Sequence, residues 1–515
     1  MLVDEIVGNH AIHRPNDEAL VVGAKRFTYG QLGAQIDDVS AALLAAGVAK
    51  GDRVAVLSHN CIEYFLLYFA TARVGAILVP LNFWHRESEH AYVLEDCAPV
   101  LLFTEASLRS SLGTLEPSLR VIALPDDDGD HDWPDFLAGS EESAPQASPV
   151  YDDDPHMILY TSGTTGRPKG AVLSHRRTVD DGVNMSSGFR PRSTDTFLNY
   201  FPPFHVGNWD HMKLFLIVGA RVILQTQFDA KIALETIEEE RVTVILGVPT
   251  MLHSLMEEPS FRTTDLSSIR MLYYGAYDPS GIMRRIGDAL GVPRGECEMA
   301  HTFGLTEGGP FVMLCEPEDI EAHWGSVGRP LPGIRAELRN DAGEPVPAGG
   351  SGELWFTGPM MTEYWNRPDD TAKTIVNGWL ATGDVMQTDS DGFYYVVDRK
   401  KDVIRSGGQN VFSKAIEDRV LEHPNVLEAA VIGLPDPIYE ESVTAVIVTD
   451  LPEDRHTKFA GEIQQFVRAE LAGYNTPRSV IFVDELPRNA VGKVRKNVLR
   501  DTYGSLFTTA RHGDA

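Results

Sequence analysis

The stretch "HMILYTSGTTGRPKGAVLSH" (residues 156–175) places a loop rich in glycine and hydroxyl groups between two short apolar runs. The runs HMILY and GAVLSH predict two strands. Glycines in the loop let successive backbone N–H groups converge on an anion. Hydroxyl and cationic side chains add donors, from Thr161, Ser162, Thr164, Thr165, Arg167 and Lys169. The loop therefore predicts a phosphate-binding site, although a plain surface turn has a similar composition. It is not a Walker A loop, because Gly170 follows Lys169.

On both sides of this loop, helical periodicity alternates with short apolar strands. Residues 28–48 predict a helix that ends at Gly47, and a strand follows at 52–59. The same order recurs at 64–81, with a glycine break, and again at 230–249. Helix–strand alternation of this kind predicts an α/β fold with layered, largely parallel sheets from about residue 20 to 330.

The C-terminal part has a different pattern. Residues 340–400 are rich in glycine, proline and aromatic residues and predict a β-rich subdomain. The charged break "DRKKD" (398–402) follows, and after it comes a small α+β unit. Its helix face is marked by Phe412, Ile416 and Val420, and its strand by Val443, Ala445 and Ile447. We therefore expect two domains, 1–398 and 399–515, which also suits a chain of 515 residues.

The composition limits the partners. With 45 Lys and Arg against 74 Asp and Glu, the formal charge is −29, which argues against nucleic acid and anionic lipid as partners. The acidic loop at 125–154 is interpreted as a solvated segment. No apolar run of 18 residues and no leader pattern occur, so we expect a cytoplasmic protein without an integral membrane span. The four cysteines, Cys61, Cys97, Cys297 and Cys315, show no CxxC spacing and predict reduced, mostly buried thiols.

Counting this loop, eight motifs stand in one order along the chain: "YTSGTTGRPKG" (160–170), "FPPFH" (201–205), "TFGLTE" (302–307), "GELWFTGP" (352–359), "YWNRP" (364–368), "WLATGD" (379–384), "DRKKDVIRSGGQNV" (398–411) and "NAVGKVRK" (489–496). With these motifs the chain resembles the adenylate-forming enzymes, a superfamily of acyl-CoA synthetases, peptide-synthetase adenylation domains and beetle luciferase. The CoA-ligase branch fits best. The resemblance implies ATP-dependent activation of a carboxylic acid as an acyl-adenylate, with Mg²⁺, followed by thioester formation with coenzyme A.

The resemblance also implies roles for individual residues. The implied catalytic residues are Lys493, His205 and Glu307, and Glu307 is also the magnesium ligand. The implied ATP and AMP contacts are Thr161, Ser162, Gly163, Thr164, Thr165, Gly166, Lys169, Gly275, Ala276, Thr302, Phe303, Thr306, Asp384 and Arg399. Asp402 is the implied hinge, about which a small mobile C-terminal domain rotates after the adenylate forms. The implied CoA contacts are Gly407, Gly408 and Tyr439, and the acyl pocket is expected at Asn208, Trp209, His211 and Tyr274.

The sequence departs from the family pattern at several positions. After the paired glycines, Ser413 replaces a proline and Ala415 replaces a glutamate, and "EE" (440–441) replaces Gly-Glu. Tyr274 and Thr302 stand where the family has glycines, and the long-chain branch uses those glycines to pass an alkyl tail. We therefore expect a short or ring-sized acid, with or without a polar substituent.

Three alternatives stay open at this point. The acyl group could pass to a carrier-protein thiol or to an amine instead of free CoA. The chain could also be an inactive nucleotide-binding regulatory protein, although the presence of Lys169, Glu307, Asp384, Arg399 and Lys493 argues against that reading. The identity of the acid and the existence of a homodimer are left undecided.

Overall fold

A computed structural model describes residues 1–125, 131–139, 147–161, 167–275, 281–407, 409–488 and 494–504. The predicted site residues Ser162, Gly163, Thr164, Thr165, Gly166, Ala276, Gly408 and Lys493 lie outside these ranges. By contact density the chain divides into two compact units. The first comprises Met1–Tyr277, Met283–Ala336 and Phe356–Ala381, and the second comprises Asp278–Ile282, Glu337–Trp355 and Thr382–Ala515.

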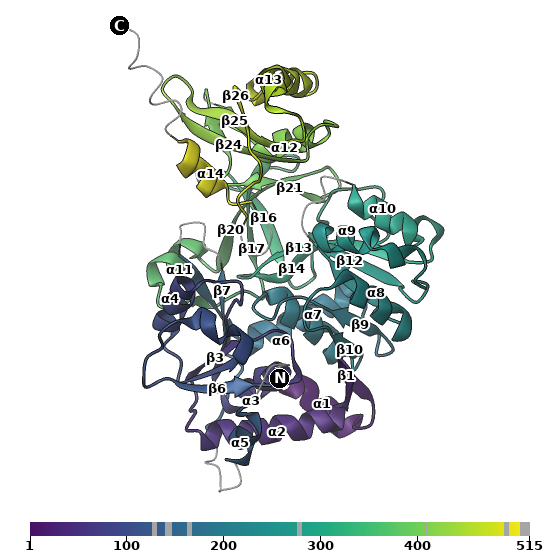
Figure 1. The fold of residues 1–515 in the computed structure, drawn as a ribbon, viewed down its shortest axis with the longest axis vertical. Helices are drawn as coiled ribbons and strands as arrows, with labels where there is room; N and C mark the ends of the chain where they lie inside the picture. The colour runs from purple at the N-terminus through teal and green to yellow at the C-terminus, as the bar shows by residue number, and fades with distance from the viewer. Residues whose placement is uncertain are drawn as a thin grey trace. The chain divides into compact units, whose positions relative to one another are not determined.

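The first unit contains a nine-stranded sheet (Figure 1). Its spatial order is β15 (Arg329–Pro330), β14 (Gly309–Cys315), β13 (Glu298–Leu305), β12 (Met271–Gly275), β11 (Val244–Gly247), β9 (Thr196–Asn199), β10 (Arg221–Leu224), β1 (Glu18–Val22) and β2 (Lys25–Thr28). The pairs from β12–β13 through β1–β10 are parallel, as predicted, and antiparallel strands close both ends.

A seven-stranded sheet forms the other half of this unit. Its order is β18 (Glu363–Tyr364), β8 (Lys169–Ser174), β7 (Pro155–Thr161), β4 (Ile77–Pro80), β3 (Arg53–Leu57), β5 (Leu101–Glu105) and β6 (Arg120–Leu124). The strands predicted on both sides of the glycine-rich loop are β7 and β8, which pair antiparallel with Thr161 opposite Lys169. The two predicted strands are confirmed, and their antiparallel pairing makes them a hairpin.

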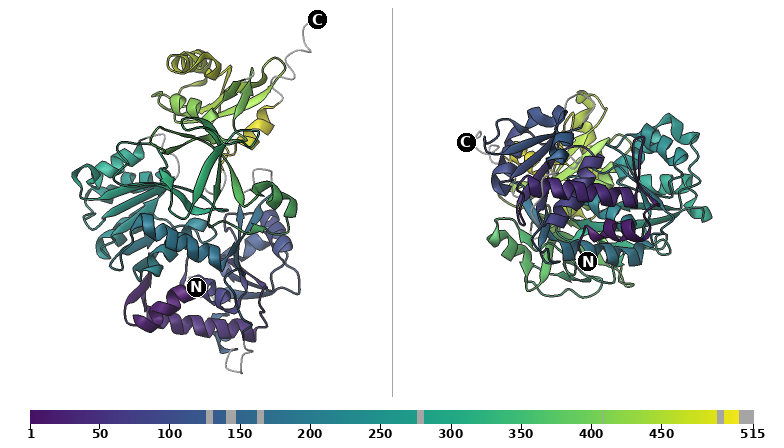
Figure 2. Two further views of the ribbon diagram at one scale, coloured as in Figure 1. Left: turned by 180° about the vertical axis from the view of Figure 1, so that it is seen from behind. Right: turned by 90° about the horizontal axis from the view of Figure 1, so that it is seen from below.

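Helices cover these sheets in the expected alternation. They are α1 (Glu5–His13), α2 (Tyr29–Ala45), α3 (Ile62–Val74), α4 (Glu87–Cys97), α5 (Trp133–Ala138), α6 (His175–Phe189), α7 (Val206–Ile217), α8 (Ala230–Glu239), α9 (Pro249–Glu257), α10 (Ile282–Ala289) and α11 (Pro368–Thr374). α6 packs on β8 of one sheet and β14 of the other, and α7 packs on β9, β10 and β14. In the rear view the teal helices α8 to α10 lie on the outer side of the nine-stranded sheet (Figure 2).

The remaining strands form two five-stranded sheets. One contains β16 (Arg335–Arg339), β17 (Ser351–Thr357), β20 (Trp379–Thr388), β19 (Ile375–Val376) and β21 (Tyr394–Arg399), which matches the predicted β-rich segment. The other contains β23 (Gln409–Val411), β22 (Ile404–Ser406), β25 (Glu440–Val448), β24 (Glu428–Asp436) and β26 (Ser479–Phe482). It packs with α12 (Ser413–Leu421), α13 (Glu453–Arg468) and α14 (Lys496–Tyr503).

The small α+β unit has the pattern expected from the sequence. Ile416 and Val420 of α12 are fully buried, and so are Val443, Ala445 and Ile447 of β25. The other members of the predicted helix face and strand face therefore meet in one core. Phe412, also predicted on the helix face, is instead the half-buried N-cap residue of α12. The division by contact density groups residues 382–398 with this unit, whereas the predicted boundary at 398 marks a pivot, and it stays a prediction.

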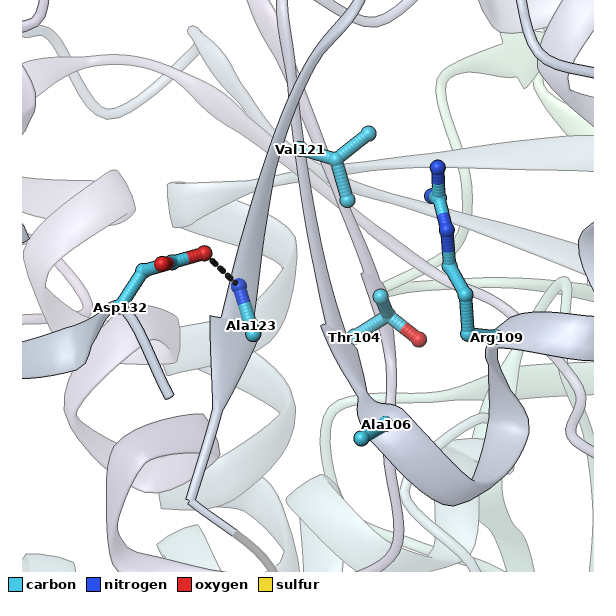
Figure 3. Close-up of a pocket in the computed structure, with 6 residues that line it drawn as sticks. All are labelled: Thr104, Ala106, Arg109, Val121, Ala123 and Asp132. Carbon is cyan, nitrogen blue, oxygen red and sulfur yellow. Dashed lines mark hydrogen bonds between the residues drawn. The ribbon is translucent and has the colours of Figure 1, made fainter. Parts of the chain in front are cut away.

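The described residues contain no helix long and apolar enough to cross a membrane. A surface hollow of about 340 Å³ lies beside β5 and β6 and is lined by Thr104, Ala106, Arg109, Val121, Ala123 and Asp132 (Figure 3). Asp132 accepts a 2.9 Å hydrogen bond from the backbone N–H of Ala123 at its rim. None of the predicted site residues that the structure describes lines this hollow.

Candidate functional site

The cation of the glycine-rich hairpin lies beside an aromatic ring. β18 pairs antiparallel with β8 so that Tyr364 stands opposite Ala171, two residues after Lys169. Because alternate strand residues share a face, Lys169 and Tyr364 point to the same side of the sheet. The Lys169 ammonium lies 5.2 Å from the centre of the Tyr364 ring and 2.7 Å from Oδ1 of Asp370 in α11. The lysine is thus held near the loop that the sequence predicts to bind phosphate.

The strand pairing also explains why Gly170 has no side chain. A Cβ at Gly170 would lie 2.6 Å from Cγ2 of Ile158 and 3.4 Å from Cβ of Trp365. The backbone N–H of Trp365 donates to the carbonyl of Gly170 at 2.7 Å. A larger residue at this position would therefore clash with Ile158 of β7, the partner strand of β8.

The predicted magnesium ligand reaches the same tyrosine from the other sheet. Glu307 lies in the turn between β13 and β14 and is half-buried, like its neighbours Phe303 and Thr306. Its Oε1 atom accepts a 2.7 Å hydrogen bond from the Tyr364 hydroxyl, and its carbonyl accepts one from the N–H of Met361 at 2.6 Å. Burial first, and then the negative charge of Glu307, raise the pKa of the Tyr364 hydroxyl, which therefore stays protonated and donates. Tyr364 thus joins the predicted phosphate and magnesium groups.

Two more predicted nucleotide contacts form a pair within the second unit. Asp384 of β20 stands directly opposite Arg399 of β21, and Nε of Arg399 lies 2.7 Å from Oδ1 of Asp384. Asp384 is 2% exposed, whereas the Arg399 side chain is 42% exposed. The N–H of Asp384 is bound by the Thr382 hydroxyl at 3.0 Å. A fixed carboxylate beside a cation can hold the hydroxyls and the phosphate of one nucleotide.

His205 begins α7 as its N-cap residue. It is exposed, and its Nδ1 accepts a 3.0 Å hydrogen bond from the N–H of Gly207. In the neutral ring the proton is therefore assigned to Nε2. Its Nδ1 is thus engaged in capping α7, so a catalytic role of the ring nitrogens would fall to Nε2.

The expected acyl-pocket residues of α7 point in different directions. Trp209 stacks on Tyr68 of α3 at 4.2 Å and donates its indole N–H to the carbonyl of Pro203 at 2.6 Å. Asn208 donates to Oδ1 of Asn60 at 2.8 Å and accepts from the amide of Asn199. Both side chains are therefore engaged in holding the helix.

His211 has a different environment. It lies among the rings of Phe197, Phe201 and Phe311 and is 4% exposed. Its Nδ1 has no hydrogen-bond partner in the described part of the chain. Burial lowers the pKa of its imidazole to about 3, so the ring is neutral at physiological pH.

The register of β12 and β13 corrects one expectation. Tyr274 stands opposite His301, and their rings stack at 4.3 Å, whereas Gly275 stands opposite Thr302. Successive residues of a strand point to opposite faces, so Tyr274 and Thr302 lie on opposite sides of the sheet. The expectation that both side chains narrow one channel is therefore wrong. The Thr302 hydroxyl instead lies 3.4 Å from where a Cβ at Gly275 would be.

Two of the predicted CoA contacts, Gly407 and Tyr439, lie together in the second unit. Gly407 has a φ of +60°, and its N–H donates to the carbonyl of Tyr439 at 2.8 Å. A Cβ at Gly407 would lie 3.3 Å from the Tyr439 ring. The Tyr439 ring is partly exposed, and the guanidinium of Arg478 lies 3.6 Å from its centre.

Comparison with known proteins agrees with the motif order. Residues 8–365 match the model of the AMP-binding enzyme family, and residues 415–493 match the AMP-binding enzyme C-terminal domain. The chain belongs to this family. The predicted adenylate-forming superfamily and fold class are confirmed.

Relatives in the family align over almost the whole chain. An indoleacetate–CoA ligase of Aromatoleum aromaticum is 34% identical over 97% of this chain and 98% of its own. A feruloyl-CoA synthase of Amycolatopsis is 36% identical over 95% and 96%, respectively. Among solved structures, ATP-bound MatB from Rhodopseudomonas palustris has a TM-score of 0.86 at 29% identity, covering 98% of this chain and all (100%) of that one.

Two residues of the site were not predicted. Tyr364 stands in the quoted motif "YWNRP", but its contact with Glu307 joins residues 57 positions apart, which no local pattern reveals. Arg478 lies in no motif, and its position over Tyr439 follows from the parallel pairing of β26 with β25. The motif itself was the one available signal for Tyr364.

Proposed function

We propose that this protein is an AMP-forming acid–thiol ligase, which activates a carboxylic acid with ATP and passes the acyl group to coenzyme A. The observation that carries the proposal is that Lys169 and Glu307 both contact Tyr364, the first at its ring and the second at its hydroxyl. A mobile cation beside a glycine-rich loop suits the β- and γ-phosphates of ATP, and a carboxylate oriented by a hydroxyl suits their metal ion. The resemblance assigns ribose and phosphate contacts of the nucleotide to Asp384 and Arg399.

Magnesium fits the residues that are present. Mg²⁺ prefers hard oxygen ligands and is commonly held by one or two carboxylates together with substrate phosphates. Glu307 would hold it, and Tyr364 would orient that carboxylate through its 2.7 Å hydrogen bond. When bound, the ion would neutralise charge on the phosphates of ATP. The chain's own residues position the nucleotide and the carboxylate around it.

Free CoA is proposed as the acyl acceptor because of the surface around Tyr439. An aromatic ring with a guanidinium 3.6 Å above it combines a stacking surface with a phosphate-binding cation. Adenine and phosphate occur together in CoA, whereas a carrier-protein thiol has no adenine. Gly407, close to the same ring, leaves room for the backbone to approach the pantetheine arm.

We propose a ring-sized acid as the substrate. His211 is neutral and stands among aromatic rings, so it suits an uncharged, flat group and offers Nδ1 to one hydrogen-bond donor. The names of the two curated relatives, an indoleacetate and a feruloyl ligase, point to the same class. Tyr274 and Thr302 lie on opposite sides of the sheet and do not bear jointly on the size of the acid.

The two half-reactions are proposed to use different arrangements of the C-terminal unit, with the chain pivoting near Asp402. Lys493 would stabilise charge in the first step, since a compact ammonium can bridge a carboxylate and the α-phosphate. It lies outside the described residues, so this role rests on the motif "VGKV" alone.

The test is pyrophosphate release from ATP with a panel of acids: acetate, octanoate, benzoate, indole-3-acetate, ferulate and palmitate, each with and without CoA. We expect a ring-bearing acid to be best and thioester to accumulate with CoA. Carboxylate-dependent release without any thioester would favour a carrier protein or an amine as acceptor. No release with any acid would favour a nucleotide-binding regulatory protein. Palmitate as the best acid would contradict the proposed size.

A further inference from the structure

The first turn of α12 is bound by a carboxylate on the other side of the predicted pivot. Oδ2 of Asp398, in β21, accepts hydrogen bonds from the Ser413 N–H at 2.6 Å, the Ser413 hydroxyl at 2.8 Å and the Lys414 N–H at 3.4 Å. Asp398 is 5% exposed and Ser413 is fully buried. The N-cap residue Phe412 provides no side-chain cap, so Asp398 performs that function from a distance.

A lysine of α14 extends this contact. Nζ of Lys496 donates to the Ser413 hydroxyl at 2.8 Å and lies 2.7 Å from Oε1 of Glu417. The hydroxyl of Ser413 therefore accepts from Lys496 and donates to Asp398. One buried side chain joins β21, α12 and α14.

The backbone at residues 400–402, where the hinge is predicted, is held on both sides. On one side the N–H of Lys400 donates to the carbonyl of Gly383 at 2.8 Å, which fixes the chain to β20. On the other side Arg500 of α14 holds Oδ1 of Asp402 at 2.7 Å. Between these contacts lies Lys401, whose side chain is exposed. The N–H groups of Asp402 and Val403 form a turn by donating to the carbonyl of Arg399, at 2.8 and 3.1 Å.

Rotation about the peptides of residues 400–402 would separate α12 from β21. Asp398 precedes the pivot and Ser413 follows it, so the Asp398–Ser413 contact can exist in one arrangement and must break in another. We propose that Asp398, Ser413 and Lys496 form a latch across the hinge, which holds the observed arrangement and must open in each catalytic cycle. The proposal rests on the proposed two-step function.

The latch depends on a residue that departs from the family pattern. Where the family has proline, this chain has Ser413, which supplies two of the donors to Asp398. A proline would supply neither, because it lacks both the N–H and the hydroxyl.

The same departure provides a clean variant. Ser413 is the first residue of α12, a position that accepts proline, and Phe412 has φ −85° and ψ 111°, close to the extended range that a following proline requires. Ser413→Pro should thus retain the helix and remove the latch. Ser413→Ala removes the hydroxyl alone. Thr449→Val is the matched control, since it removes a half-buried hydroxyl that donates to the carbonyl of Asn425 elsewhere in the unit.

The first measurement is the rate at which trypsin cuts the native full-length protein within Arg399–Lys401, followed by fragment mass. We expect cleavage about 10-fold faster in Ser413→Pro, an intermediate increase in Ser413→Ala and no change in Thr449→Val. Unchanged cleavage in both Ser413 variants, with thermal midpoints near the parent's, would overturn the latch. If Ser413→Pro fails to fold, Ser413→Ala alone decides in the same way.

The second measurement separates the two half-reactions, using the best acid of the panel. Pyrophosphate exchange reports adenylation, and transfer from the preformed acyl-adenylate to CoA reports thioester formation. Releasing the latch should change the ratio of the two rates at least 5-fold, while equal losses in both steps contradict it. Faster cleavage without exchange by any acid would refute the proposed function but leave the latch supported.

Discussion

The Tyr364 hydroxyl donates a 2.7 Å hydrogen bond to Oε1 of Glu307, and the ring of the same tyrosine lies 5.2 Å from the Lys169 ammonium. β18 supplies the tyrosine, β8 supplies the lysine and the turn after β13 supplies the glutamate. A single side chain therefore sets the distance between the groups proposed to hold phosphate and metal.

Removing that hydroxyl should weaken the use of magnesium more than the use of ATP. Residues that orient a metal ligand typically contribute about 10–100-fold to metal affinity. In Tyr364→Phe we expect the Mg²⁺ concentration for half-maximal pyrophosphate exchange to rise about 10-fold, with a smaller change in KM for the acid. Tyr29→Phe is the control, because it removes a buried hydroxyl that donates to the carbonyl of Ala220. An unchanged Mg²⁺ dependence would show that Glu307 does not need this partner.

The buried carboxylate of Asp384 should act on the nucleotide alone. Hydrogen bonds to a charged group contribute about 1.5–3 kcal/mol, so Asp384→Ala should lower kcat/KM for ATP ~10–100-fold. KM for the acid should change little. Asp450→Ala, at an exposed position of the same unit, should behave like the parent. If the acid and ATP parameters fall together, Asp384 supports the fold rather than the nucleotide.

The strands and most motif positions could be predicted because their signals are local. The orientation of α7 could not, since all residues from Val206 to Leu216 are buried and no polar face distinguishes one side. The sequence does not indicate which way the rings of Trp209 and His211 point. In the structure Trp209 packs on α3, whereas His211 lies among Phe197, Phe201 and Phe311.

The error at Tyr274 and Thr302 has a similar cause. Which side chains share a face depends on the register of β12 against β13, where Tyr274 meets His301. A shift of one residue reverses every face, and the sequence of two buried strands does not fix it. The Asp398–Ser413 contact could not be predicted either, because it joins β21 and α12 through tertiary packing.

Lys493→Ala should separate the two steps. The motif predicts a role in charge stabilisation during adenylation, so that rate should fall about 10²–10³-fold, equivalent to about 3–4 kcal/mol. Transfer from a preformed acyl-adenylate should be much less affected. Lys458→Ala, on the exposed face of α13, is the control. Equal damage to both half-reactions is the result that rules out the assignment.

A buried group of four charges should make a large contribution to stability. Lys213 of α7 lies 2.8 Å from Oδ2 of Asp181 and 2.6 Å from Oδ1 of Asp210, and Arg177 lies 3.1 Å from Asp210. All four side chains are at most 2% exposed. Lys213→Met leaves two carboxylates with one cation between them.

The cost of that change should be about 3–5 kcal/mol in the free energy of unfolding, because an uncompensated charge remains buried. The urea midpoint of the first unit should fall accordingly, with an unchanged slope. Lys231→Met removes one partner of an exposed pair with Glu235 in α8 and should change stability by about 0.5 kcal/mol or less. Similar midpoints for the two variants would contradict the argument.

Two buried histidines should make stability depend on pH. Burial is the main cause that lowers the pKa of His211 to about 3 and that of His175 to about 4, from an ordinary value of 6.5. As pH falls below 6.5, these histidines bind protons in the unfolded chain but stay neutral in the folded chain. The folded state therefore loses stability until the pH reaches the pKa of the histidine in the folded protein. Each histidine contributes up to about 1.4 kcal/mol per pH unit in that window.

The slope of unfolding free energy against pH between 6 and 4.5 should therefore decrease by up to this amount in His211→Gln, and again in His175→Gln. Carboxylates contribute equally to parent and variant and cancel in the difference. Parallel slopes in all three proteins would mean that these imidazoles gain protons without unfolding.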